Sequence, residues 1–186
     1  VEAMSIPELS VEGFEADDVI ATVAENAVPE GYSVVVVSAD KDHMQLVRPG
    51  VAMYDPMKDR HYDRDAVIEK FGVPPELVAD ALALAGDASD NVPGVPKVGP
   101  KTAAKLITQF GDVEGVIAGV QTIEKPKAAE RSVIEHQQSA RLSKRLTILA
   151  IDAPIEWNNG ALRYRPADPD LLGAFLDKIE AHTLMR

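Results

Sequence analysis

The chain has 186 residues, of which 46% are hydrophobic and 26% charged, with a net charge of −11 and no cysteine. These values are ordinary for a folded globular protein, so they exclude extended disorder, disulfides, thiolate catalysis and zinc sites built on cysteine. The apolar runs are about four to six residues long, far below the roughly 20 of a membrane helix, so we expect no membrane partner and a cytoplasmic protein.

The first part of the sequence alternates helix and strand signals. Apolar residues recur at helical spacing over 17–27, with acidic residues in the first turn, where the helix dipole favours negative charge. The β-branched run 32–37 predicts a strand buried on both faces of a parallel sheet. A short helix over 43–47 and a second strand over 51–54 follow, and this alternation is typical of an α/β fold.

From residue 63 the pattern becomes helical. We predict helices over 65–71, 74–85, 101–110, 112–118 and within 126–146, then a strand over 148–155 and a last helix over 169–181. We therefore divide the chain into the C-terminal half of an α/β core (1–62), a helical subdomain (63–147) and a strand and helix that close the core (148–186).

Charge is divided unevenly along the chain. Residues 1–96 carry 6 basic and 19 acidic side chains, whereas residues 97–145 carry 9 basic and 5 acidic ones. Taken alone, an acidic block followed by a basic block indicates two differently solvated faces. The motifs in the two blocks decide between that interpretation and a functional one.

Three groups of acidic residues stand at the ends of predicted elements. They are Glu15, Asp17 and Asp18; Asp40 and Asp42; and Asp87 and Asp90. Gathered carboxylates repel one another unless cations lie between them, and Mg²⁺ prefers such oxygen ligands. Two such ions can activate a water and stabilise the leaving oxygen of a phosphodiester. Any one group alone is more simply surface or helix-capping charge, but three groups at consecutive element ends favour a metal site.

The loop before residue 101 has the pattern of a helix-hairpin-helix, in the run GVPKVGPKTAA. Gly99 lets the backbone approach a phosphate, Pro100 suits the first helical turn, and the next backbone amides face an anion. An ordinary Gly-Pro turn does not need this run, so we predict binding to the DNA backbone without sequence reading. The residues expected to contact DNA are Lys97, Gly99, Lys101, Thr102 and Lys105.

The chain resembles the 5' nuclease family, which includes flap endonucleases and the 5'-3' exonuclease domain of bacterial DNA polymerase I. The resemblance runs in order through GFEADDVIATVA, VVVVSADKDHMQLV, FGVPPELVADALALAGDASDNVPGVPKVGPKTAAKL and LLGAFLDKIE. It implies a PIN-like (Rossmann-like) nuclease core, present in part, with a mostly helical helix-hairpin-helix subdomain that holds duplex or branched DNA.

The resemblance also implies two-metal hydrolysis, with Mg²⁺ or Mn²⁺, of 5' flaps and RNA primer ends in replication and repair. Carried over by motif, the metal ligands are Glu15, Asp17, Asp18, Asp40, Asp42, Asp87 and Asp90, with Asp17, Asp18, Asp40 and Asp42 also catalytic. It further implies K⁺ held by backbone carbonyls of the hairpin loop, a monomer, and continuity with polymerase domains in a parent chain.

The sequence departs from the family pattern in several places. Ala39 and Lys97 replace usual glycines, and Ala88 replaces a common serine. Family members begin with an Asp-bearing strand, then a second Asp-containing segment and a helical arch. This sequence begins at Val1 and enters the pattern at the helix just before the Glu-Ala-Asp-Asp motif. We therefore expect a fragment with an incomplete first metal site, an open sheet edge and little or no cleavage of 5' flaps.

Two other functions stay open. A non-catalytic, sequence-independent DNA-binding module would use only the hairpin, but it would not need the seven carboxylates. A PIN-like ribonuclease is less consistent with the sequence, because such enzymes lack the hairpin subdomain.

Overall fold

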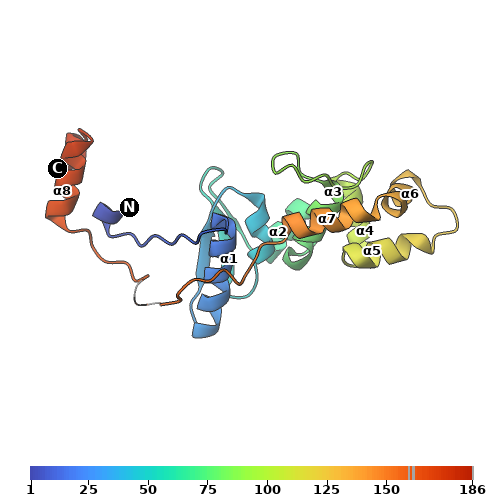
Figure 1. Ribbon diagram of the computed structural model, residues 1–186, viewed down its shortest axis with the longest axis horizontal. Coiled ribbons are helices and arrows are strands. Elements are labelled where there is room, and N and C mark those ends of the chain that lie inside the picture. The colour runs from blue at the N-terminus through green and yellow to red at the C-terminus, as the bar shows by residue number, and fades with distance from the viewer. Residues whose placement is uncertain (159, 161, 186) are drawn as a thin grey trace.

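The computed structural model describes residues 1–158, 160 and 162–185 of the chain. The molecule is elongated: α2 to α7 fill one half, the sheet and α1 stand beside them, and the N-terminal residues and α8 lie at the other end (Figure 1). The helices and strands are η1 (Glu2–Met4), α1 (Ala16–Ala27), η2 (Val28–Glu30), β1 (Val34–Val37), η3 (Lys41–Leu46), β2 (Val51–Asp55), β3 (Arg60–Tyr62), α2 (Arg64–Phe71), η4 (Pro75–Leu77), α3 (Val78–Ala85), α4 (Pro100–Phe110), α5 (Val113–Gln121), α6 (Ala128–Glu135), α7 (Gln137–Thr147), α8 (Pro169–Lys178) and η5 (His182–Met185), where η marks a 3₁₀ helix.

The sheet has the order β1-β2-β3, with β1 parallel to β2 and β2 antiparallel to β3. The parallel pair confirms the predicted α/β alternation. The prediction that the first strand is buried on both faces is wrong, because Val35 and Val37 are 54% and 63% exposed. Val36, which points the other way, packs with Ala21 and Ala24 of α1. Among the described residues, one face of β1 is therefore covered and the other is open.

The main hydrophobic core lies in the helical half. Helix α3 is buried from Val78 to Leu84 and packs against both α4 and α7. Its neighbours in this core include Ile107 of α4, Val116 of α5 and Val133 of α6. A second, much smaller core lies between α1 and the first two strands. The main core also includes Met44 of η3, Met53 of β2 and Tyr62 of β3, so it joins the sheet to the helices, while the outer face of β1 has little cover among the described residues.

The predicted strand over 148–155 does not form. Its backbone is extended, but it runs across α1 instead of pairing with a strand. The carboxylate of Asp18 accepts the Ala150 N–H at 2.9 Å, and the Thr22 hydroxyl accepts the Ala153 N–H at 3.1 Å. Side-chain oxygens of α1 thus accept the backbone N–H groups that the carbonyl groups of a neighbouring strand would accept in a sheet.

The predicted last helix forms as α8, and it begins at Asp168, whose carboxylate accepts the Asp170 and Leu171 N–H groups. It lies beside η1 at the end of the molecule instead of on the sheet (Figure 1). Residues 159, 161 and 186 of the predicted C-terminal part lie outside the described residues. Of the helices that the structure describes, none has the length and apolar character needed to traverse a bilayer.

Candidate functional site

The turn that follows β1 orients the first functional carboxylate. Asp40 caps η3: its Oδ1 accepts the backbone N–H of Asp42 at 2.9 Å. The Asp40 N–H donates in turn to the Ser38 hydroxyl at 3.0 Å. Asp40 therefore fixes the start of η3, and Asp42 projects from the first turn of that helix.

A tight loop after α3 carries the next two carboxylates. Asp87 and Val92 form a two-way backbone bridge, with N···O distances of 3.0 and 2.8 Å, which closes the loop. The Asp87 carboxylate accepts the N–H and the hydroxyl of Ser89 at 3.0 and 2.5 Å. Gly94 lies against Gly86 so closely that a Cβ on Gly94 would stand 2.4 Å from the Gly86 nitrogen. The loop geometry therefore depends on glycine at position 94.

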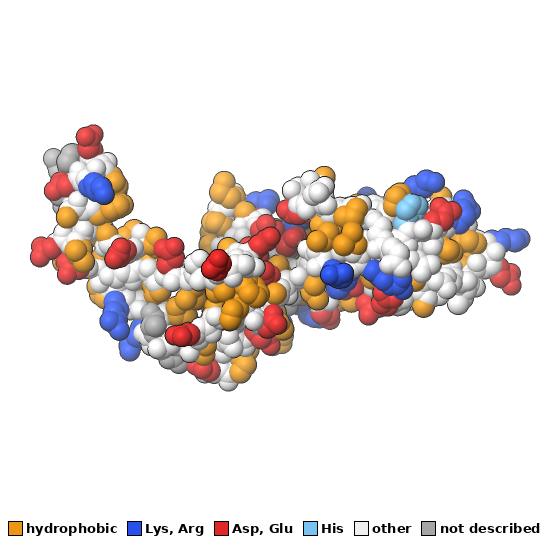
Figure 2. Space-filling model, in the orientation of Figure 1, with side chains coloured by type: hydrophobic (Ala, Val, Ile, Leu, Met, Phe, Trp, Pro, Cys, Tyr) orange, Lys and Arg blue, Asp and Glu red, His pale blue; other side chains and the backbone are white. Residues whose placement is uncertain are grey.

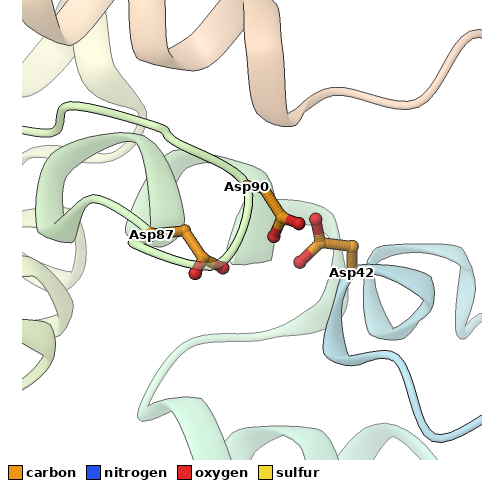
Figure 3. A group of neighbouring side chains, drawn as sticks. All are labelled: Asp42, Asp87 and Asp90. Carbon is orange, nitrogen blue, oxygen red and sulfur yellow. The ribbon is translucent and has the colours of Figure 1, made fainter.

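These two loops bring three aspartates together, Asp42 from η3 and Asp87 and Asp90 from the loop after α3 (Figure 3). One carboxylate oxygen of each lies within 4.8 Å of those of the other two. Asp42 and Asp87 are half-buried and Asp90 is exposed. We call this group the aspartate cluster. It joins residues far apart in the sequence at one edge of the sheet half.

The cluster shifts the pKa values of its members. Burial and the neighbouring Asp40 raise the pKa of Asp42 to about 6. Burial and the charge of Asp87 raise the pKa of Asp90. Burial also opposes ionisation of Asp87, but Lys41 and Ser89 outweigh it and lower the pKa of Asp87 to about 2. The charged forms of Asp42 and Asp90 are thus disfavoured, as expected where carboxylates crowd together.

Lys41 is the cation nearest the cluster. Its ammonium forms an ion pair with Asp87 Oδ2 and lies 3.4 Å from the Ser89 hydroxyl. Burial disfavours the charged lysine, but Asp87, Asp42 and Asp90 together raise its pKa. One lysine balances only part of the charge of three aspartates.

The cluster fits a hard divalent cation. Its donors are all carboxylate oxygens, which such ions prefer. Asp42 Oδ1 is buried and accepts no hydrogen bond from the described residues, so its lone pairs are free. Among the described residues, the cluster is the only group of three or more metal-ligating side chains within this distance.

The other predicted ligands stand outside this cluster. Asp40 caps η3, as described above. Glu15 precedes α1, and its N–H donates to Asp18 Oδ2 at 3.4 Å. Both oxygens of Asp18 therefore accept backbone N–H groups, one from Glu15 and one from Ala150. Asp17 is the member of its group whose carboxylate faces η3, where it lies 3.3 Å from the Nε2 of His43.

His43 is a residue of η3 whose side chain contacts Asp17 of α1, and the sequence alone does not identify it. Its side chain is 2% exposed, and neither ring nitrogen has a hydrogen bond of regular geometry within the described residues. Its position one residue after Asp42 was the available signal. The contact with Asp17 depends on the tertiary packing of α1 and could not be inferred from spacing.

The hairpin loop has the backbone that the sequence predicts. Gly99 is the N-cap of α4 and Pro100 is its first residue. The Thr102 and Ala103 N–H groups both donate to the Gly99 carbonyl, whereas the Lys101 N–H has no partner among the described residues. Lys97 has φ of 66°, a left-handed conformation that favours glycine.

The lysines of this loop differ from two basic residues of α7. Arg141 and Lys144 of α7 form ion pairs with Glu114 and Asp80. Within the part of the chain that the structure describes, the hairpin lysines form none; these exposed residues are Lys97, Lys101 and Lys105. Lys and Arg side chains gather toward the end of the molecule formed by α4 to α7 (Figure 2). The hairpin therefore offers positive charge that no carboxylate neutralises.

Two family models match the chain. The model described as "5'-3' exonuclease, N-terminal resolvase-like domain" matches residues 1–72, and that described as "5'-3' exonuclease, C-terminal SAM fold" matches residues 73–170. The junction of the two models falls within the predicted helical subdomain, close to the end of α2.

Curated relatives have related names. The chain is 45% identical over 184 residues to a DNA polymerase I of Rhizobium leguminosarum, covering 99% of this chain and 18% of that protein. It is 37% identical over 183 residues to a 5'-3' exonuclease of Aquifex aeolicus, covering 97% of this chain and 61% of that protein. The chain thus spans less than two thirds of either relative.

Solved structures show the same fold. The 5'-exonuclease of T5 with bound zinc ions superposes with a TM-score of 0.73 at 23% identity, over 94% of this chain and 62% of that one. The catalytic core of Rad2 in complex with DNA gives a TM-score of 0.56 at 18% identity, over 95% of this chain and 59% of that one. These likenesses confirm the predicted nuclease fold of α/β core and helical subdomain.

Proposed function

The chain belongs to the 5'-3' exonuclease family, and from that premise we propose that it is the 5' nuclease part of a longer protein of the DNA polymerase I type. Its substrates are duplex or branched DNA with a 5' flap, and RNA primer ends. The protein acts in the cytoplasm. The reaction is hydrolysis of a phosphodiester bond with Mg²⁺ or Mn²⁺. The chain acts as a monomer that continues into polymerase domains.

The meeting of Asp42 with Asp87 and Asp90 is the observation that carries this proposal. Two loops more than 40 residues apart place three carboxylates together, although their mutual repulsion disfavours the arrangement. A pure DNA-binding module gains nothing from such a group. The family to which the chain belongs gives the cluster a purpose, which is to hold divalent cations at the scissile phosphate.

Divalent ions bound there supply Lewis-acid stabilisation and a metal-activated water. The residues of the chain do the positioning. Ser89 and the bridge between Asp87 and Val92 hold the loop, and Asp40 holds the start of η3. The uncompensated hairpin lysines and the free Lys101 N–H bind phosphates, so that the strand is oriented before hydrolysis.

A second ion would use Glu15, Asp17 and Asp18 together with residues beyond this chain. Asp17 is the best supported of these, because its carboxylate faces η3. Asp18 can join only if it gives up a backbone hydrogen bond. For K⁺ at the hairpin, the Lys97 and Val98 carbonyl oxygens accept no hydrogen bond from the described residues, which leaves them available.

Cleavage of a 5'-flap substrate by the proposed full-length protein tests the function. Asp87→Asn should abolish cleavage in Mg²⁺ and in Mn²⁺, and Asp65→Asn, at an exposed first-turn position of α2, should leave it unchanged. Equal cleavage by parent and Asp87→Asn would contradict the role of the cluster. If neither parent nor variants cleave, yet all bind DNA, the non-catalytic binding module is the better description.

A further inference from the structure

A groove between α2 and α4 extends the positive surface of the hairpin. It has a volume of about 580 Å³ and lies open to solvent. Its walls include Lys101 and Lys105 on α4, and Lys70, Phe71 and the acidic Glu69 at the end of α2. Two of the three hairpin lysines thus share a groove with a lysine that the sequence did not single out.

A second cavity, of about 260 Å³, continues from this groove toward the aspartate cluster. The two cavities share Lys70, Phe71 and Pro100 in their walls. The second also has Lys41 and Asp87 in its wall. Lys70 therefore lies between two adjoining cavities, one beside the hairpin and one beside the cluster.

Lys70 differs from the other cations at this end of α2. Arg60 pairs with Glu69, Lys58 with Asp55 and Arg64 with Glu76. Lys70 has no hydrogen bond or ion pair with any described residue. Its Nζ lies 5.1 Å from the centre of the Tyr62 ring and 5.5 Å from that of Phe71. The two rings hold the ammonium in place without neutralising it.

The surroundings of Lys70 favour an anion. Burial and the positive charge of Lys58 lower the pKa of Lys70; Asp55 opposes this effect, and Lys41 and Arg60 add to it. An ammonium held among other cations gains from any phosphate that enters the groove. The hairpin binds one part of the DNA strand and the aspartate cluster acts on another. A cation between them can bind a phosphate of the intervening strand.

We propose that this groove carries the phosphates of the DNA strand between the hairpin and the aspartate cluster, and that Lys70 contacts one of them. The proposal rests on the proposed function, because it takes DNA as the ligand. Lys70 is a positioning residue. It fixes the distance along the strand between the phosphates bound by the hairpin and the phosphate at the aspartate cluster.

A purely structural role for Lys70 makes a different prediction. If its stem and ammonium serve only to cover Tyr62 and Phe71, replacement would change the melting temperature but not the salt dependence of DNA binding. A phosphate contact instead changes the number of counter-ions released on binding, whatever happens to stability. The two roles are therefore separable by experiment.

The test measures binding of a duplex with a single-stranded 5' arm, by fluorescence anisotropy without divalent metal. Lys70→Met should weaken binding about fivefold at 50 mM salt, and the ratio of variant to parent Kd should shrink about threefold by 200 mM, since one phosphate contact is lost. Lys70→Arg should bind like the parent. Lys178→Met, an equal charge change on α8 outside the groove, should also bind like the parent.

Neutral methylphosphonate linkages, placed one at a time along the arm and adjoining duplex, locate the contact. One neutral linkage should weaken DNA binding by the parent but not by Lys70→Met, and another should do the same for the pair of parent and Lys101→Met. The linkage identified with Lys70→Met should lie nearer the cleaved end than the one identified with Lys101→Met. Equal salt slopes for parent and Lys70→Met, or no linkage with this pattern, would overturn the proposal. Failure of the parent itself to bind DNA would instead contradict the proposed function.

Discussion

The two halves of the molecule differ in how completely they are packed. The helical half is built around α3, whose residues from Val78 to Leu84 are all buried. The sheet half has a core of five buried residues and leaves Val35 and Val37 exposed. The outer face of β1 is thus the least covered part of the fold, whereas η3, which supplies Asp42, is anchored in the main core through Met44 and the adjoining Val47.

In both halves, some of the charges assigned to function have no partner of opposite charge among the described residues, although Asp87 is paired with Lys41. The hairpin lysines have no acidic partner within the described residues, while Arg141 and Lys144 of the same half do. In the sheet half, Asp42 has a free buried oxygen, whereas the buried Asp55 is paired with Lys58. The unpaired hairpin lysines and the free oxygen of Asp42 are available to phosphates and cations.

Replacing Leu84 by alanine is expected to have the largest effect on stability. Leu84 is fully buried at the centre of the helical core, so the change should cost about 3 kcal/mol. Val36→Ala removes less volume from the smaller core, and we expect about 1 kcal/mol. Urea unfolding followed by circular dichroism measures both. A larger loss from Val36→Ala would reverse the comparison of the two halves.

Asp80→Ala should lower the free energy of unfolding by nearly as much as Leu84→Ala. The Asp80 carboxylate is buried, accepts the Val113 N–H at 3.1 Å and pairs with Lys144 at 2.7 Å. Its removal leaves both donors unpaired, which we expect to cost about 3 kcal/mol. Glu69→Ala breaks the exposed pair with Arg60 and should cost less than about 0.5 kcal/mol. Similar urea midpoints for the two variants would show that burial does not decide the outcome.

In the metal-free protein, ionisation of Asp42 should reduce the free energy of unfolding as the pH rises from about 4 to about 7. The folded pKa of Asp42, about 6, lies above its ordinary value of 3.8, so the folded state binds more protons than the unfolded state between those values. Asp42→Asn should flatten this dependence and raise metal-free stability above pH 6 by about 1 kcal/mol, since Asp42 is only half-buried.

Thermal melts in EDTA at several pH values measure this effect. Asp65→Asn, an exposed first-turn residue of α2, should melt like the parent throughout. A parent whose stability rises between pH 4 and pH 7 as steeply as that of Asp42→Asn would contradict the assignment of strain to Asp42.

Lys97→Gly is expected to raise the stability of the fold and to weaken its binding to DNA. Glycine relieves the left-handed conformation at φ of 66°, which should stabilise the fold by about 1 kcal/mol. Loss of the ammonium should weaken DNA binding and reduce its salt dependence. Lys97→Met removes the charge without relieving the backbone. If Lys97→Gly and Lys97→Met melt alike, the conformation at position 97 carries no strain.

Much of this arrangement was predictable, because local patterns determine it. The valine run, the Asp-Lys-Asp turn after it and the hairpin run predicted β1, η3 and the start of α4. The strand over 148–155 was wrong because the side chains of Asp18 and Thr22, distant in sequence, bind its amides. The exposure of Val35 is likewise set by what covers the sheet, which local β propensity does not report.

The aspartate cluster shows the same limit. Spacing predicted seven candidate ligands, but only tertiary structure shows that Asp42, Asp87 and Asp90 meet while Asp18 binds backbone amides. The roles of Lys41, His43 and Lys70 depend on contacts between separate elements. These could not be inferred from the chain alone, because neither exposure nor ion pairing is local.

Mn²⁺ binding to the isolated chain, measured by calorimetry for the parent and for Asp87→Asn, tests the central claim most directly. The account predicts that Asp87→Asn weakens Mn²⁺ binding more than about tenfold, because one of three carboxylate ligands is lost. It also predicts that Asp87→Asn binds metal-free DNA at least as well as the parent, while Lys101→Met retains Mn²⁺ and loses DNA affinity. Equal Mn²⁺ affinity for the parent and Asp87→Asn would contradict the assignment of the aspartate cluster as the metal site.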